Sequence, residues 1–298
     1  MWVSHPDFLS TVSQCWSTTV VGSPLYIFFI KLKLLRAHLR SWNRNTFGII
    51  HQNVCNAEDR VSSAEITCNQ DPNEANRGIL AEAKKNLHKV LLQEEIFWRQ
   101  KSRVKWLKEG DRNTKFFHNL VKARRCKKGV ECIKDNLASW VIGEARVAEE
   151  VIRYFSAIFS SQGSQGDDEL LGIIPHVISK EDNNCLVVTP SLEEVKSAIF
   201  YLAIDSAPGP DGFFGHFFTA CWDIVGVDVW EAVKDFFSGG YLPRSFTSTH
   251  LVLIPKKDNP EVMADFCLIS LCNFSYNIIA KTLSSCLSML LPLIISEE

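Results

Sequence analysis

The amino-acid sequence predicts an α+β protein in which helices predominate. Apolar residues recur every three or four positions over most of the chain, which is the spacing of one face of an α-helix. Only two places carry short aliphatic runs on either side of a polar turn, which is typical of β-hairpins. The 298 residues are 46% hydrophobic and 22% charged, so the chain has the composition of a globular protein and the length to bury a core.

The amino-terminal part divides into a leader and a long helix. Residues 1–20 are expected to form a leader ahead of the folded domains. Ser23-Pro24 should start the helix, because serine caps helices well and proline suits the first helical position. Gly48 should end it. Between them, one helical face carries Phe28, Leu32, Leu35, Leu39 and Trp42.

Two further helices are expected to complete a helical arm over residues 21–128. A helical run over residues 57–67 precedes the polar break Asn69–Asn73 and a longer helix. One charged residue interrupts the apolar row of that longer helix, which consists of Leu80, Leu87, Leu91, Glu94 and Trp98. Long helices joined by a short break favour an antiparallel helical hairpin.

The arm ends in a strongly basic region. Between Arg99 and Lys128 there are 12 lysine or arginine residues and two acidic ones. Gly110-Asp111 should end the long helix and cap the next one, over residues 113–125. Basic residues with aromatic residues between them suit a nucleic-acid backbone with stacked bases. We therefore expect an RNA or DNA backbone to contact Lys105, Trp106, Lys108, Arg112, Lys115, Phe117, Lys122, Arg124, Arg125, Lys127 and Lys128. The alternative is an exposed helix whose aromatic residues face the core.

The remaining residues, 129–298, begin with a hairpin and an amphipathic helix. Short strands are expected at residues 130–133 and 139–142, with a turn at Asp135-Asn136. The helix at residues 144–160 should bury Val147, Val151, Phe155 and Ile158. Residues 161–168 are rich in glycine, glutamine and serine and are expected to form an acidic insertion loop.

A capped helix then leads into a loop rich in proline and glycine. Ser191-Leu-Glu-Glu194 is a capping box that should open a helix reaching about residue 203. The prolines and glycines of Ala207-Pro-Gly-Pro-Asp-Gly212 favour a rigid turn. The Asp211 carboxylate could ligate a cation, but in such a turn it usually bonds its own backbone.

Two more helices should contribute most of the core. They are expected at residues 213–225 and 228–237, on either side of Gly226, with Asp228 and Glu231 as a second capping box. Their apolar row is expected to be core rather than a stacking platform and consists of Phe217, Phe218, Cys221, Trp222, Val225, Val229, Val233 and Phe236.

A second hairpin and a last helix follow. The strands Leu251–Ile254 and Leu268–Leu271 are expected on either side of a polar loop that carries Lys256 and Lys257. These two ammonium groups could meet phosphate oxygens as point charges, and the alternative is a solvated turn. The last helix should use Ile279, Leu283, Cys286 and Leu290 and stop at Pro292.

Charge and cysteine content restrict the possible functions. The net charge of −2 conceals +10 over residues 99–128 and −10 over residues 161–240, which suggests that one face alone meets a polyanion. The ten cysteines show no Cys-x-x-Cys pair and no Cys/His spacing suited to zinc, so we expect reduced thiols in an intracellular protein, nuclear or cytoplasmic. Neither a signal peptide nor a membrane span is predicted. Asp167-Asp168 is expected to be a solvated linker, and the sequence predicts no metal site, no catalytic residue and no specific protein partner.

Five stretches, in order, resemble the reverse transcriptases encoded by plant non-LTR (LINE-type) retrotransposons. The family pattern Leu-Ile-Pro-Lys, followed by Asp-Phe-Arg-Pro-Ile-Ser-Leu-Cys-Asn, is matched by the run from His250 to Asn273. The others are Ser41-Trp-Asn-Arg-Asn-Thr-Phe-Gly48, Trp106-Leu-Lys-Glu-Gly-Asp-Arg-Asn-Thr-Lys-Phe-Phe-His118, Ala207-Pro-Gly-Pro-Asp-Gly212, and Leu291-Pro292 with Ile295-Ser296. The resemblance implies the fingers and the start of the palm of a right-hand polymerase fold, incomplete, in residues 129–298. It also implies that residues 1–20 are a remnant of an endonuclease junction.

The sequence departs from this family at the residues that carry out nucleotide transfer. In the complete family enzyme, palm aspartates hold two Mg²⁺ ions that stabilise the attacking and leaving oxygens, whereas no Ala-Asp-Asp motif occurs here. Cys267-Leu268 stands where the family has Arg-Pro, so the charged contact of that arginine with nucleotide phosphates is lost. We therefore expect a truncated reverse-transcriptase-like chain without a cofactor of its own, which does not polymerise alone and retains RNA or DNA binding. The alternatives are the front half of an active reverse transcriptase completed by downstream sequence, and an inert pseudogene product.

Overall fold

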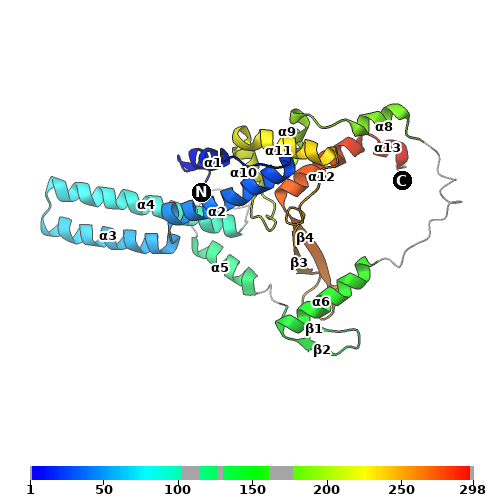
Figure 1. Cartoon of the computed structure of the whole chain (residues 1–298). Coiled ribbons are helices and arrows are strands. Elements are labelled where there is room, and N and C mark those ends of the chain that lie inside the picture. The colour runs from blue at the N-terminus through cyan, green and yellow to red at the C-terminus, as the bar shows by residue number, and fades with distance from the viewer. Residues whose placement is uncertain (1, 103–113, 127–129, 161–176, 296–298) are drawn as a thin grey trace. The chain divides into compact units, whose positions relative to one another are not determined.

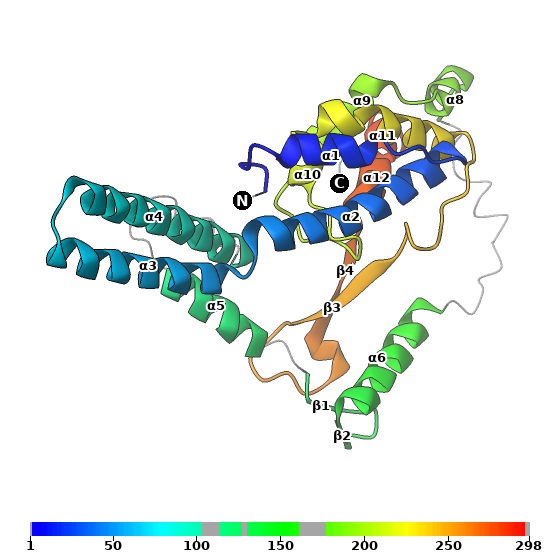
Figure 2. The ribbon, with the colours of Figure 1, turned by 60° about the vertical axis from the view of Figure 1, so that its left-hand side comes forward.

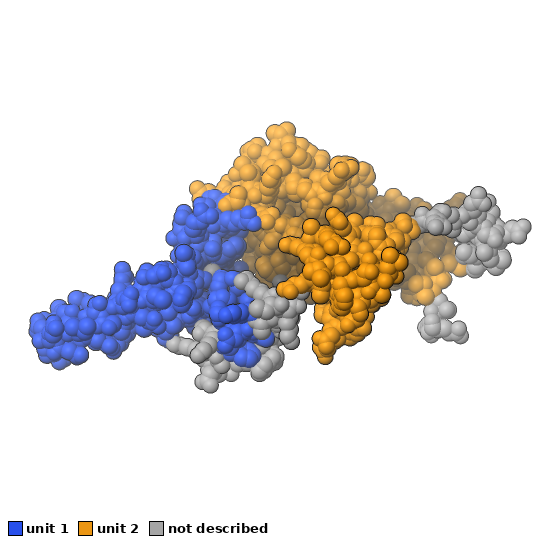
Figure 3. All heavy atoms as spheres, turned by 90° about the horizontal axis from the view of Figure 1, so that it is seen from below, with its two compact units in different colours: residues 1–8, 38–129 blue, residues 9–37, 130–298 orange. Residues whose placement is uncertain are grey.

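The computed structural model describes residues 2–102, 114–126, 130–160 and 177–295. Most of these residues are helical, and the strands form two separate two-stranded sheets. The chain divides into two compact units (Figure 3): unit 1 is residues 1–8 and 38–129, and unit 2 is residues 9–37 and 130–298. The mainly helical character is thus as expected, while the polymerase fold stays a prediction.

A long helical hairpin makes up most of unit 1 (Figure 1, Figure 2). Helices α3 (Ile50–Gln70) and α4 (Glu74–Ser102) run antiparallel and side by side, as predicted. At the turn between them, Oδ1 of Asn73 accepts a hydrogen bond from the backbone N–H of Asn76 at 2.8 Å, which satisfies one free N–H at the start of α4. Helix α5 (Thr114–Cys126) packs against α4. The predicted break at Gly110-Asp111 lies outside the described residues.

Helix α2 (Pro24–Phe47) follows the prediction closely. It begins at Pro24 and ends before Gly48, whose φ of 55° is in the left-handed region that glycine adopts at a helix end. Of its predicted apolar face, Phe28, Leu32, Leu35 and Leu39 are buried. The periodicity of the sequence therefore identified this helix correctly.

The expected leader is in fact folded. Residues 8–16 form helix α1 (Phe8–Trp16). Within unit 1, Trp2 Nε1 donates to Asn43 Oδ1 at 2.6 Å, and the ring of Trp2 meets Trp42 edge-on with centroids 6.3 Å apart. The expected leader is therefore packed at Trp2, Phe8 and Trp16, because these aromatic side chains find partners on α2; its origin as an endonuclease junction stays a prediction.

In unit 2, α1 is tied to helix α11 (Trp222–Phe237) through a half-buried polar contact. Asp228 Oδ2 accepts hydrogen bonds from Trp16 Nε1 at 2.6 Å and from Lys31 Nζ at 2.7 Å. The predicted role of Asp228 as a helix cap is therefore wrong, since α11 already begins at Trp222 and continues through Gly226. A Cβ on Gly226 would lie 2.8 Å from the Trp222 ring, so glycine at this position lets the ring lie against its own helix.

Six other α-helices of unit 2 are described. They are α6 (Glu144–Phe159), α8 (Lys180–Val187), α9 (Leu192–Tyr201), α10 (Gly215–Ala220), α12 (Phe274–Ser288) and α13 (Leu291–Ile294). The predicted capping box is present at α9, where Ser191 Oγ accepts from Glu194 N at 3.3 Å and Glu194 Oε2 accepts from Ser191 N at 2.7 Å. The apolar row of α10 and α11 is buried as predicted, except that Phe236 is half-buried. Pro292 lies inside α13 rather than after the last helix.

The two hairpins and α6 form a small second core in unit 2. Strands β1 (Cys132–Lys134) and β2 (Trp140–Ile142) pair antiparallel, as do β3 (Thr249–Pro255) and β4 (Phe266–Cys272). The core residues come from both hairpins and α6 and are Ile133, Val141, Val147, Met263 and Phe266. Ile158 was expected to be buried but is 56% exposed, because the far end of α6 extends beyond this core. The predicted loop at residues 161–168 lies outside the described residues.

Candidate nucleic-acid interface

The residues predicted to bind nucleic acid belong to the end of the arm, and only part of them is described. Lys105, Trp106, Lys108, Arg112, Lys127 and Lys128 lie outside the described residues. Lys115, Arg124 and Arg125 belong to α5, and Lys122 is exposed on the same helix. Phe117 is 2% exposed, so its ring packs inside unit 1 and offers no face to a base. The predicted role of Phe117 is therefore corrected from base stacking to helix packing.

Aromatic rings and a cation gather where α4 and α5 meet. This α4–α5 cluster consists of Phe97, Trp98, Lys101 and His118. The rings of Trp98 and His118 meet edge-on with centroids 4.6 Å apart, and Lys101 Nζ lies 4.0 Å from the centroid of Phe97 and 5.3 Å from that of Trp98. Phe97 and Trp98 are half-buried, whereas Lys101 and His118 are exposed. A partly open ring beside an exposed cation can stack a base and attract a phosphate.

The sequence did not indicate that the rings of Phe97 and Trp98 belong to this cluster. Trp98 was assigned to the apolar face of the arm, and Phe97 was given no role. The sequence feature that could have pointed to these rings is the start of the basic region at Arg99, directly after Phe97 and Trp98. Which ring remains half-open depends on how α5 packs on α4, and helical periodicity does not give that packing.

Lys256 and Lys257 are both exposed and both bind the loop that carries them. Lys256 Nζ donates to the carbonyl oxygen of Ala264 at 3.0 Å, and Lys257 Nζ lies 2.9 Å from Asp265 Oδ1. Hydrogen bonds from the backbone N–H groups of Glu261 and Val262, together with Lys257, lower the pKa of Asp265 to about 2. A phosphate would therefore compete with existing partners for these two ammonium groups, and the phosphate contact stays a prediction.

The proline- and glycine-rich loop is fixed by one amide side chain. Asn273 is 3% exposed; its Oδ1 accepts from Asp211 N at 3.0 Å, and its Nδ2 donates to the carbonyl oxygen of Phe246 at 2.9 Å. A Cβ on Gly209 would lie 2.4 Å from the backbone nitrogen of Asn273, so glycine is required by close approach. Asp211 Oδ1 accepts from Phe213 N at 3.1 Å, as expected for a carboxylate that bonds its own turn.

The other carboxyl oxygen of Asp211, Oδ2, lies in an environment that disfavours the charged form. Oδ2 is buried and accepts no hydrogen bond from the described residues. Burial raises the pKa of Asp211 to about 6, and the N–H of Phe213 and the Arg36 guanidinium reduce this rise only in part. In the described ranges, no group of three or more His, Cys, Asp or Glu side chains is arranged to hold a metal ion.

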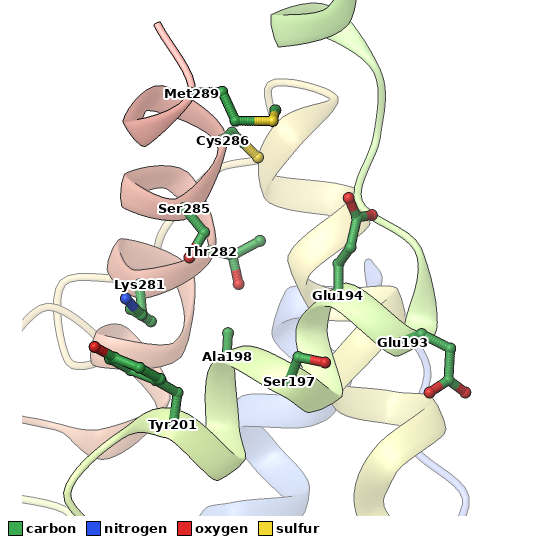
Figure 4. A pocket seen from close by; sticks show the side chains of 10 residues that line it. All are labelled: Glu193, Glu194, Ser197, Ala198, Tyr201, Lys281, Thr282, Ser285, Cys286 and Met289. Carbon is green, nitrogen blue, oxygen red and sulfur yellow. The ribbon is translucent and has the colours of Figure 1, made fainter. Parts of the chain in front are cut away.

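An open groove of about 530 Å³ lies between α9 and α12 in unit 2 (Figure 4). Tyr201 and Lys281 lie at one end, with Lys281 Nζ 4.0 Å from the tyrosine ring centroid, and Cys286 lies toward the other. Glu194 is already committed to the capping box with Ser191. Burial raises the pKa of the Cys286 thiol, with the Glu194 carboxylate adding to the rise, and this disfavours a reactive thiolate.

Within the described part of the chain, no helix combines the length and the apolar character needed to cross a membrane.

Sequence comparison gives a distant relative. No protein-family model matches the chain. It is 25% identical over 303 residues to the transposon TX1 uncharacterized 149 kDa protein of Xenopus laevis, and the match includes the whole of this chain. The chain is similar to a transposon protein. This similarity supports a transposon-derived origin, while the chain spans about a fifth of the length of that relative, 22%.

Proposed function

We propose that the chain is the amino-terminal part of a reverse-transcriptase-like protein of a non-LTR (LINE-type) retrotransposon, and that it binds an RNA or DNA backbone. In this proposal residues 21–128 form a nucleic-acid-binding arm, and residues 129–298 correspond to the fingers and the start of the palm. The five ordered motifs support the family, and the similarity to a transposon protein is consistent with it.

The observation that carries the binding proposal is the α4–α5 cluster. Half-buried Phe97 and Trp98 lie beside Lys101. Arg99 and Lys122 are exposed on the same two helices. The region from Arg99 to Lys128 carries +10, and a positive field of this kind draws a polyanion to rings that can stack its bases.

The proposal assigns no polymerisation to these residues alone. Two-metal nucleotide transfer needs carboxylates that clamp Mg²⁺ between the attacking and leaving oxygens, and the printed sequence holds no Ala-Asp-Asp motif. At the fingers hairpin, Cys267 is an exposed thiol on β4, and a thiol cannot replace the two-pronged phosphate contact of an arginine. Lys256 and Lys257 would supply only weak single contacts to a nucleotide.

Fluorescence anisotropy with a 20-nucleotide single-stranded RNA over a salt series tests the binding. The logarithm of the affinity should fall linearly with the logarithm of the salt concentration. Combined Arg99→Ala, Lys101→Ala and Lys122→Ala substitutions should reduce the steepness of that line by about 2, at roughly 0.7 per lost phosphate contact. The matched control is Arg60→Ala, Arg77→Ala and Lys89→Ala, which removes three exposed charges from the other part of the α3–α4 hairpin.

Two outcomes would overturn the proposal. Binding that is absent or does not respond to salt would leave no role for the basic end of the arm. Primer extension with Mg²⁺ tests the second part: incorporation of nucleotides by this chain alone would favour an active reverse transcriptase.

A further inference from the structure

Helix α2 carries an unusual charge distribution that the basic count at the end of the arm did not include. Over its 24 residues it has five lysine or arginine side chains and no aspartate or glutamate. Lys31 is neutralised by Asp228, 2.7 Å away. The other four lie on one side of the helix and are termed here the α2 stripe: Lys33, Arg36, Arg40 and Arg44.

The spacing of the α2 stripe follows from one continuous helix. Successive members are three, four and four residues apart, so each turn of 5.4 Å presents about one cation and the row is about 16 Å long. Lys33, Arg40 and Arg44 are exposed, and Arg36 is half-buried. None of the four forms an ion pair with another described residue; the Asp211 carboxylate attracts Arg36 only at longer range.

A row of cations without counter-charges attracts a polyanion. The shape of the row indicates which class of polyanion fits it. A linear array with about one charge per turn suits the regularly spaced phosphates of a nucleic-acid strand. A membrane surface would also attract cations, but a membrane-bound helix inserts its apolar face. That face of α2 is already buried in the protein, at Phe28, Leu32, Leu35 and Leu39.

We propose that the α2 stripe is a second contact surface for the phosphate backbone of a single nucleic-acid strand, separate in the sequence from the α4–α5 cluster. The inference rests on the proposed nucleic-acid binding and extends it to a helix that lies at least 50 residues earlier in the chain. The stripe contains no aromatic residue, so its binding is electrostatic and independent of base sequence.

The experiment compares three triple variants in the anisotropy assay with 20-nucleotide RNA. Lys33→Ala, Arg40→Ala and Arg44→Ala should weaken binding on the order of 10- to 100-fold at 0.1 M salt and reduce the salt slope by about 2. The charge-preserving set Lys33→Arg, Arg40→Lys and Arg44→Lys should retain the affinity. The Arg60, Arg77 and Lys89 alanine control should change it by less than about threefold. All these side chains are exposed, and circular dichroism confirms that each variant is folded.

The outcomes separate this inference from the proposed function. Absence of binding by the unsubstituted chain overturns both. If the unsubstituted chain binds and the α2 variant binds equally well, the α2 stripe has no role and the α4–α5 cluster stands alone. An equal loss in the control variant, or equal competition by polyglutamate, would show attraction by net charge rather than a nucleic-acid surface.

Discussion

Substitution of Asn273 tests whether the proline- and glycine-rich loop is held as the structure shows. Asn273 precedes α12 at the position where asparagine usually caps its own helix, yet its side chain makes no such bond. It binds the backbone N–H of Asp211 and the carbonyl oxygens of Ser245 and Phe246, at 3.0, 3.3 and 2.9 Å. One buried amide thus joins two loops to the end of β4.

Asn273→Ala should lower the free energy of unfolding by about 3 kcal/mol, at roughly 1 kcal/mol for each buried hydrogen bond lost. Asn273→Asp should cost at least as much, because a carboxylate would then face two carbonyl oxygens without a proton to donate. Urea unfolding of the whole chain, followed by tryptophan fluorescence, measures this as a shift in midpoint of about 1 M.

Asn277→Ala is the matched control, since Asn277 is half-buried on the same helix and forms no side-chain hydrogen bond with a described residue. Its cost should stay below about 0.5 kcal/mol. If Asn273→Asp unfolds at the same urea concentration as the unsubstituted chain, the amide does not hold the loop, and this interpretation of the Ala207–Gly212 motif fails.

Two other predictions concern the carboxylates of Asp211 and Asp228, which are both half-buried. The folded-state pKa of Asp211 is raised from 3.8 to about 6, so its stabilising contribution is complete below about pH 3.8 and is lost as the pH rises through 6. Relative to Asp211→Asn, the unsubstituted chain should lose up to about 3 kcal/mol between pH 4 and pH 7, and parallel urea midpoints across that range would refute the burial of a charge. Asp228→Ala should cost about 3 kcal/mol, because it leaves Lys31, only 15% exposed, without its counter-charge. Thermal unfolding of this variant, beside the exposed-residue control Asp223→Ala, measures the cost, and equal melting temperatures would contradict it.

A helix could be predicted from the sequence where it carries one long apolar face and local signals at both ends. In α2 the apolar residues recur at helical spacing between Pro24 and Gly48, and both ends carry local signals. The capping box at Ser191 and Glu194 was equally readable, because all its hydrogen bonds lie within four residues. Both hairpins were found for the same reason, since turn residues and aliphatic runs are neighbours in the sequence.

The errors occurred where a residue's role depends on a distant partner. Asp228 and Glu231 have the spacing of a capping box, but the Asp228 carboxylate binds Trp16, 212 residues away. Gly226 was expected to break a helix, yet it gives room to the Trp222 ring inside a continuous one. Helix α1, inside the expected leader, was not predicted because Trp2 and Trp16 are stabilised by residues on other elements.

In the candidate interface, the sequence predicted the charge but not which aromatic rings are exposed. Charge is additive along the sequence, so the basic region from Arg99 to Lys128 could be found by counting. Burial is decided by packing, and the sequence could not show that Phe117 lies inside while Trp98 stays half-open beside Lys101. The α2 stripe needed both charge and burial, because its four cations can be assigned to a polyanion only once the apolar face of the same helix is known to be buried. Electrostatic surfaces can therefore be anticipated from sequence, whereas the rings that would read a nucleic acid are identified only once helices are packed.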